Sequence, residues 1–154
     1  MENPYSPPTA ESDLASASAF TSPKLYSATH VGWATFLGSA MAGSILMALN
    51  YYRMGRAGKG HLSLVMGAVC TIALMAFSFS LPDDFPGLPL PLSLTVTFLG
   101  YVTAKSLQKR EVDDRIINGQ GQYASGWAVV GIGLGSSVVT GAILFGIIIL
   151  LFPY

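Results

Sequence analysis

Four stretches without a single Asp, Glu, Lys, Arg or His constrain the fold of this 154-residue chain more than any other feature. They cover residues 31–52, 62–81, 88–104 and 127–152. A helix needs roughly 20 apolar residues to cross about 30 Å of hydrocarbon. In lipid, every backbone polar group must also be paired within the protein, which leaves helices or closed barrels as spanning structures. The pattern therefore predicts an all-α transmembrane bundle of four helices over residues 30–154.

The third stretch, residues 88–104, is the shortest of the four, and Pro86, Pro89 and Pro91 crowd its start. Proline suits the first turn of a helix but not its interior. A re-entrant hairpin is therefore an alternative to a full crossing for this stretch, and the placement of charge bears on the choice.

Basic side chains are concentrated in two of the connections between stretches. These residues are Arg53, Arg56 and Lys59 in one connection, and Lys105, Lys109, Arg110 and Arg115 in the other. The connection between the second and third stretches carries Asp83 and Asp84 instead. Cytoplasmic loops carry an excess of Lys and Arg, so both basic connections are expected inside. This parity requires residues 88–104 to cross, and it predicts four spans with both the N-terminus and the C-terminus outside.

Residues 1–29 are rich in Ser, Ala, Thr and Pro and contain no apolar run long enough to bury. Such a composition predicts a disordered tail. The segment also lacks the basic start of a cleavable signal peptide, so the first hydrophobic helix is expected to direct insertion.

Chemistry-bearing residues do not converge anywhere in the sequence. Ionisable residues at membrane depth mark ion and proton pathways, and the four stretches contain none. A membrane-bound enzyme would have to rely on His61, Glu111, Asp113 and Asp114 at the cytoplasmic face. We therefore expect no catalytic site, no metal site, no cofactor and no enzymatic activity. A net charge of zero also argues against a nucleic-acid partner.

Small residues four positions apart are the clearest pattern inside the stretches. They allow helix backbones to approach closely in lipid, so they are candidates for helix-packing seams within the chain or between subunits. The candidate residues are Gly38, Ser39, Ala42, Gly43, Gly131, Gly135, Ser137 and Gly141.

Residues 30–60 read HVGWATFLGSAMAGSILMALNYYRMGRAGKG. This string resembles the opening of small, functionally uncharacterised bacterial inner-membrane proteins. The residues that carry the likeness are Gly32, residues 35–38, Ala42, Gly43, Asn50 and Tyr51. The resemblance implies a multi-pass protein of the bacterial inner membrane, and it transfers no functional residue.

These observations favour a non-enzymatic accessory or scaffold subunit of the cell membrane. It would contact the lipid bilayer and form homo- or hetero-oligomers through its transmembrane helices. The alternative is a transporter or channel for a small neutral or lipidic solute, which would use Ser, Thr, Asn50 and backbone groups. A polar cavity at mid-membrane would be the sign of this alternative.

Overall fold

The structure, a computed structural model, describes residues 22–80 and 89–151. Of these residues, 84% are helical, in five helices, which confirms the all-α class. The elements in chain order are β1 (Lys24–Leu25), α2 (Ala28–Arg53), α3 (Ala57–Phe79), α4 (Pro89–Leu107), α5 (Lys109–Ile117), β2 (Gln122–Tyr123) and α6 (Gly126–Leu151). By length and composition, α2, α3 and α6 are apolar enough to cross a membrane. The 19-residue α4 begins at Pro89, as expected of a proline in a first helical turn.

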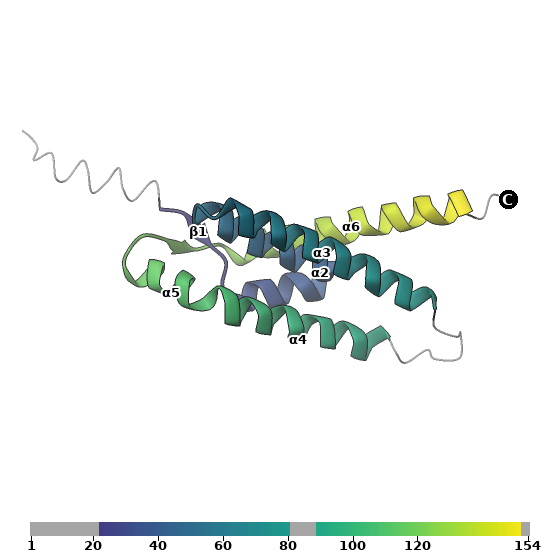
Figure 1. The fold of residues 1–154 in the computed structure, drawn as a ribbon, viewed down its shortest axis with the longest axis horizontal. Helices are drawn as coiled ribbons and strands as arrows, with labels where there is room; N and C mark the ends of the chain where they lie inside the picture. The colour runs from purple at the N-terminus through teal and green to yellow at the C-terminus, as the bar shows by residue number, and fades with distance from the viewer. Residues whose placement is uncertain (1–21, 81–88, 152–154) are drawn as a thin grey trace, which may run out of the picture.

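Helix α2 is folded back on itself at Ser39. The backbone of Ser39 is not helical (φ 84°, ψ 174°), and it separates a first arm, residues 28–38, from a second arm, residues 40–53. The amide nitrogen of Tyr26, just before the first arm, lies 2.7 Å from Oδ1 of Asn50 near the end of the second arm. In a straight helix these positions would be separated by about 36 Å. The two arms are therefore antiparallel and form a helical hairpin with Ser39 at its tip (Figure 1).

Small residues allow the arms to lie against each other. A Cβ atom built on Gly43 in the second arm would lie 2.1 Å from Oγ1 of Thr35 in the first. The Thr35 hydroxyl donates to the carbonyl of Val31 at 2.9 Å, so its polar atom is satisfied inside the arm. A Cβ atom on Gly100 of α4 would lie 2.8 Å from the same Oγ1. Thr35 is thus enclosed by two glycines, one from the hairpin and one from α4.

The hairpin corrects the prediction of one continuous helix over residues 31–52. That prediction placed the N-terminal side of the stretch across the membrane from Arg53. In the structure, residues 22–27 lie at the same end of the molecule as Arg53, α5 and β2 (Figure 1). Two short apolar arms have the same length and hydropathy as one span, so hydropathy alone could not separate the two arrangements.

The hairpin is the central element of the fold, and α3, α4 and α6 each pack against it. Glycines again mark the closest approaches. A Cβ atom on Gly67 of α3 would lie 2.2 Å from Oγ of Ser44, and one on Gly133 of α6 would lie 3.0 Å from Cβ of Leu37. Within the described ranges, α3, α4 and α6 make few or no contacts with one another. Their far ends extend beyond the hairpin tip, away from β1 and α5 (Figure 1).

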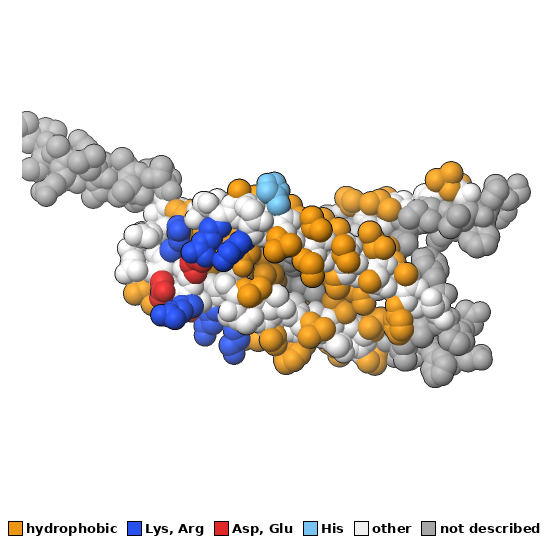
Figure 2. Space-filling view, viewed as in Figure 1, with side chains coloured by type: hydrophobic (Ala, Val, Ile, Leu, Met, Phe, Trp, Pro, Cys, Tyr) orange, Lys and Arg blue, Asp and Glu red, His pale blue; other side chains and the backbone are white. Residues whose placement is uncertain are grey.

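The eight Lys and Arg residues of the chain lie at the β1 and α5 end of the molecule, where Figure 2 shows them gathered. They are Lys24, Arg53, Arg56, Lys59, Lys105, Lys109, Arg110 and Arg115. Among the described residues, the acidic side chains are Glu111, Asp113 and Asp114, also at this end. The rest of the visible surface is dominated by hydrophobic side chains (Figure 2). We call the charged end the basic end.

A buried amide network fastens the N-terminal segment to the basic end. Asn50 is fully buried; its Oδ1 accepts from the Tyr26 amide, and its Nδ2 donates to the Tyr26 carbonyl at 2.8 Å. Nδ2 also lies 3.0 Å from Oε1 of Gln108, whose Nε2 donates to the carbonyl of Met47 at 2.9 Å. Every polar atom of the Asn50 side chain therefore has a partner, as a buried amide requires.

Residues 22–29 belong to the fold, which corrects the prediction of a disordered tail over residues 1–29. Strand β1 pairs in parallel with β2, with Lys24 opposite Gln122 and Leu25 opposite Tyr123. Leu25 is wholly buried in a cluster with Tyr51, Met54 and Val112. Its burial and the Asn50 network supply the stability that composition alone did not indicate. Residues 1–21 lie outside the described part of the chain.

Candidate functional site at the hairpin tip

The most unusual residue of the structure is Ser39, at the tip of the hairpin. Its backbone angles fall in a region that is essentially restricted to glycine, and such a residue costs roughly 1–3 kcal/mol. Its hydroxyl oxygen is buried and has no hydrogen-bond partner among the described residues. Ser39 therefore combines backbone strain with an unpaired polar atom. Strain of this kind is found preferentially at functional sites.

Helix α6 holds the tip in place from one side. Oγ of Ser137 donates to the carbonyl of Leu37 at 2.5 Å, two residues before the tip. A Cβ atom on Gly38 would lie 2.3 Å from the carbonyl oxygen of Gly133 and 2.6 Å from Cβ of Ala42. No side chain larger than hydrogen fits at Gly38, because its close neighbours are the α6 backbone at Gly133 and the side chain of Ala42 in the other arm of the hairpin.

A cavity of about 480 Å³ surrounds the tip. Residues 35–40 form one side, and the remaining lining residues are Leu74 and Ser78 from α3, Leu92, Ser93 and Val96 from α4, and Ser137, Thr140 and Gly141 from α6. The described lining residues are mostly apolar, with hydroxyl groups from all four helices, and none of them is charged. The volume lies within the range of about 300–1,000 Å³ that is typical of small-molecule sites.

The cavity hydroxyls differ in how they are paired. Ser78 donates to the carbonyl of Leu74 at 2.9 Å, and Ser137 donates to Leu37 as described above. Ser93, Thr140 and Ser39 make no hydrogen bond within the part of the chain that the structure describes. Of the three, only the Ser39 oxygen is buried; Ser93 is exposed and Thr140 is half-buried. Three unpaired hydroxyls, each from a different helix, therefore meet at one cavity.

The tip lies about 16 Å along the hairpin from the start of its first arm, at 1.5 Å per helical residue. Ser137 and Thr140 lie about 17–21 Å along α6 from Gly126. The hydrocarbon core of a bilayer is about 30 Å thick. The cavity is therefore about half a bilayer away from the basic end.

The predicted helix-packing residues fall into two groups in the structure. Gly38, Ala42 and Gly43 lie inside the hairpin, and Ser137 bonds the hairpin to α6. By contrast, a Cβ atom on Gly131, Gly135 or Gly141 would meet no atom within 4 Å. Gly135 borders a 590 Å³ groove between α3 and α6, and Gly141 borders the tip cavity. The sequence predicts Ser39 as a packing residue from its small size, and no sequence signal beyond the neighbouring glycine indicates its backbone conformation.

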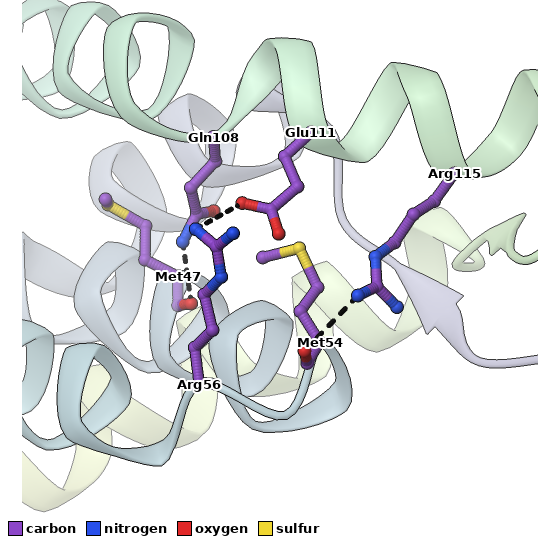
Figure 3. Close-up of polar contacts among 6 residues, drawn as sticks. All are labelled: Met47, Met54, Arg56, Gln108, Glu111 and Arg115. Atoms are coloured by element: carbon purple, nitrogen blue, oxygen red, sulfur yellow. Dashed lines mark hydrogen bonds and ion pairs between the residues drawn. The ribbon is translucent and has the colours of Figure 1, made fainter.

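Two arginines at the basic end are paired with neighbours from other elements. Arg56 forms an ion pair with Glu111 at 2.9 Å, and Arg115 donates to the carbonyl of Met54 at 3.3 Å (Figure 3). The Gln108–Met47 bond lies beside them in the same view. Because these contacts join α5 to the α2–α3 connection, they hold the basic end together.

The remaining acidic and histidine candidates do not meet. Tyr123 donates to Asp113 at 3.1 Å, and burial together with this contact raises the pKa of the tyrosine. His61 lies 3.0 Å from the Tyr52 hydroxyl. Among the described residues, no three His, Cys, Asp or Glu side chains are grouped as a metal site would require. These described residues of the basic end are therefore held in pairwise contacts.

Comparison with protein-family models, with curated proteins and with solved structures found no match to this chain. The functional argument consequently depends on the hairpin, the cavity and the distribution of charge.

Proposed function

We propose that α3, α4 and α6 cross the membrane and that α2 enters it as a re-entrant hairpin from the basic end. The positive-inside rule then places the basic end in the cytoplasm, with residues 22–27, and the C-terminal end of α6 outside. This arrangement replaces the expected four spans with three. It keeps both basic connections on one side, because α3 and α4 run in opposite directions. The proposed re-entrant segment falls in residues 31–52, whereas the sequence left a re-entrant hairpin open only for residues 88–104.

Single-cysteine labelling tests this topology. Cys70 is exposed on α3, so it is first replaced by alanine. Cysteines introduced at Ser22, Gln120 and Asp84 are then treated with a membrane-impermeant maleimide in right-side-out vesicles, before and after permeabilisation. We expect Ser22→Cys and Gln120→Cys to react only after permeabilisation, and Asp84→Cys before it. Reaction of Ser22→Cys together with Asp84→Cys would restore the four-span arrangement.

The function that the geometry supports best is that of a non-enzymatic accessory or scaffold subunit, in the bacterial inner membrane that the resemblance implies. One observation carries this proposal: α3, α4 and α6 pack against the hairpin but hardly against one another. Beyond the tip, the apolar faces of these helices lack helix neighbours within residues 22–80 and 89–151. On the outer face of α6, Gly131 is followed by the exposed side chains of Leu134, Val138 and Phe145. A glycine on such a face allows a helix of a second subunit to approach closely.

Cysteine crosslinking in native membranes tests the assembly. In the Cys70→Ala background, Gly131→Cys and Val138→Cys place thiols on the outer face of α6. We expect an oxidant to join either variant to a second copy or to another membrane chain. Val129→Cys is the matched control, because Val129 is 3% exposed and packs inside the fold. If the two outer variants crosslink no more than the control and native mass spectrometry shows only a monomer, the proposal fails.

A second candidate function is the binding or passage of a small neutral solute. The hydroxyl-bearing cavity at the hairpin tip favours it, since a polar cavity near mid-membrane is what such a function requires. Half-helix ends at mid-membrane form substrate sites in many transporters. The described residues of the lining carry no charge, which favours a neutral solute over an ionic one.

A further inference from the structure

We propose that the tip cavity is a binding site for a small polyol, recognised by the hydroxyl groups of Ser39, Ser93 and Thr140. This inference deepens the second candidate function and is independent of the assembly proposal. It starts from the cost of leaving polar groups unpaired. The Ser39 hydroxyl is buried without a hydrogen-bond partner among the described residues, which is costly. Ser93 and Thr140 line the same cavity with hydroxyls that are also unpaired, so an occupant with hydrogen-bonding groups could satisfy all three.

The residues that line the cavity indicate which class of molecule can bind there. Among the described residues that line the cavity none is charged, so none of them would compensate an ion for its lost hydration. A purely apolar molecule would leave the hydroxyls of Ser93 and Thr140 unpaired. Leu74, Leu92 and Val96 provide aliphatic surface between the hydroxyls. A polyol matches both features, because its C–H groups can lie against the aliphatic side chains while its hydroxyls donate to and accept from serine and threonine.

The position of Ser39 gives it a specific part in recognition. Its hydroxyl is buried beside the cavity, and a rotation about its Cα–Cβ bond is required for it to reach an occupant. Glycine would adopt the same backbone conformation without strain but would offer no hydroxyl. We therefore infer that the hydroxyl of Ser39 contributes to binding, and that this contribution outweighs the backbone strain that serine causes at this position.

Saturation-transfer NMR with the purified full-length protein in nanodiscs tests the site directly. Erythritol is the probe, and acetate and methylammonium are the charged controls. We expect a transfer signal from erythritol and none from the ions. Ser93→Ala and Thr140→Val should weaken erythritol binding by roughly three- to tenfold each, the value of one hydrogen bond. Thr97→Val is the matched control, since Thr97 lies on α4 but lines a different cavity, between α2 and α4.

The results of these experiments distinguish the polyol site at the tip cavity from the passage of a solute through the protein. Circular dichroism and size-exclusion chromatography first establish that each variant is folded. An erythritol signal that falls in the two cavity variants and persists in Thr97→Val supports the site. The site is wrong if wild type gives no signal or if Thr97→Val weakens binding equally.

Stopped-flow swelling of phosphatidylethanolamine–phosphatidylglycerol vesicles then tests passage. Polyol entry that depends on Ser93 and Thr140 supports both the site and the second candidate function. Binding without entry supports the site and excludes transport. Water permeability that exceeds that of empty vesicles, without erythritol binding, overturns the polyol assignment.

Discussion

Replacing Ser39 with glycine should make the protein more stable. The φ of 84° and ψ of 174° at Ser39 cost roughly 1–3 kcal/mol for a residue with a Cβ atom and little for glycine. Glycine loses more backbone entropy on folding, which offsets about 0.5–1 kcal/mol of that gain. The expected net stabilisation from the backbone is therefore on the order of 0.5–2 kcal/mol.

Ser39→Ala separates the backbone from the hydroxyl. Alanine keeps the Cβ atom and hence the strain, but it removes the unpaired oxygen atom. The difference in unfolding free energy between Ser39→Gly and Ser39→Ala therefore measures the backbone alone. We expect the glycine variant to exceed the alanine variant by about 0.5–2 kcal/mol. Both variants should bind erythritol less tightly than wild type if the hydroxyl takes part in recognition.

Reversible unfolding in mixed micelles of dodecyl maltoside and sodium dodecyl sulfate provides the measurement, with helical circular dichroism as the signal. The unfolding free energies of wild type and both variants are compared at the same detergent mole fraction. If Ser39→Gly is less stable than Ser39→Ala, residue 39 does not adopt the left-handed conformation in the folded protein. The hairpin would then turn in some other way, and the argument for a strained tip would be refuted.

Three further changes test other parts of the fold. Asn50→Ala leaves the buried amide and carbonyl groups of Tyr26 unpaired and should lower the free energy of unfolding by about 2–5 kcal/mol. Hydrogen exchange should accelerate in residues 22–27, and unchanged exchange would contradict the amide network. Gly38→Ala should destabilise the protein by more than 1 kcal/mol in the same micelle assay because it clashes with helix backbone, whereas Gly131→Ala should have no such effect; equal effects would contradict the packing at the tip. The proton of Tyr123 is held more tightly in the folded state, so its contribution to stability is complete below the unfolded pKa and disappears as pH rises through the folded pKa. The tyrosinate absorbance difference between wild type and Tyr123→Phe should therefore titrate above pH 10, and titration at or below that value would refute the contact with Asp113.

The sequence was sufficient for the helical class and for the grouping of basic residues, because both depend on composition over long windows. It was not sufficient for the hairpin. Residues 28–53 are apolar along both arms, and a turn in the middle changes neither length nor hydropathy. The run of small residues around Ser39 was read as a packing seam, and Gly38 and Gly43 do pack closely. Gly43, however, contacts the other arm of α2, whereas Gly38 contacts both the other arm and helix α6.

The candidate site was also only partly accessible from sequence. The spacing of small residues predicts a packing role for Ser137, yet its hydrogen bond to the Leu37 carbonyl is a long-range contact that no local pattern encodes. Ser93 and Thr140 were ordinary polar residues within apolar stretches until the fold brought them to one cavity. Asn50 stood out in an apolar run, but its partner Gln108 lies 58 positions further on and carries no signal of its own.

The contacts that complete the hairpin impose an order on its biosynthesis. Residues 22–53 leave the ribosome before the rest of the fold, since strand β2 follows about 70 residues later and Ser137 later still. Until then, β1 lacks its paired strand and the Leu37 carbonyl lacks its donor from α6. A segment that is synthesised early in the fold therefore gains its last contacts late. A ribosome-bound chain that stops before α6 should hold its hairpin only through the arms, α3, α4 and the Asn50 network.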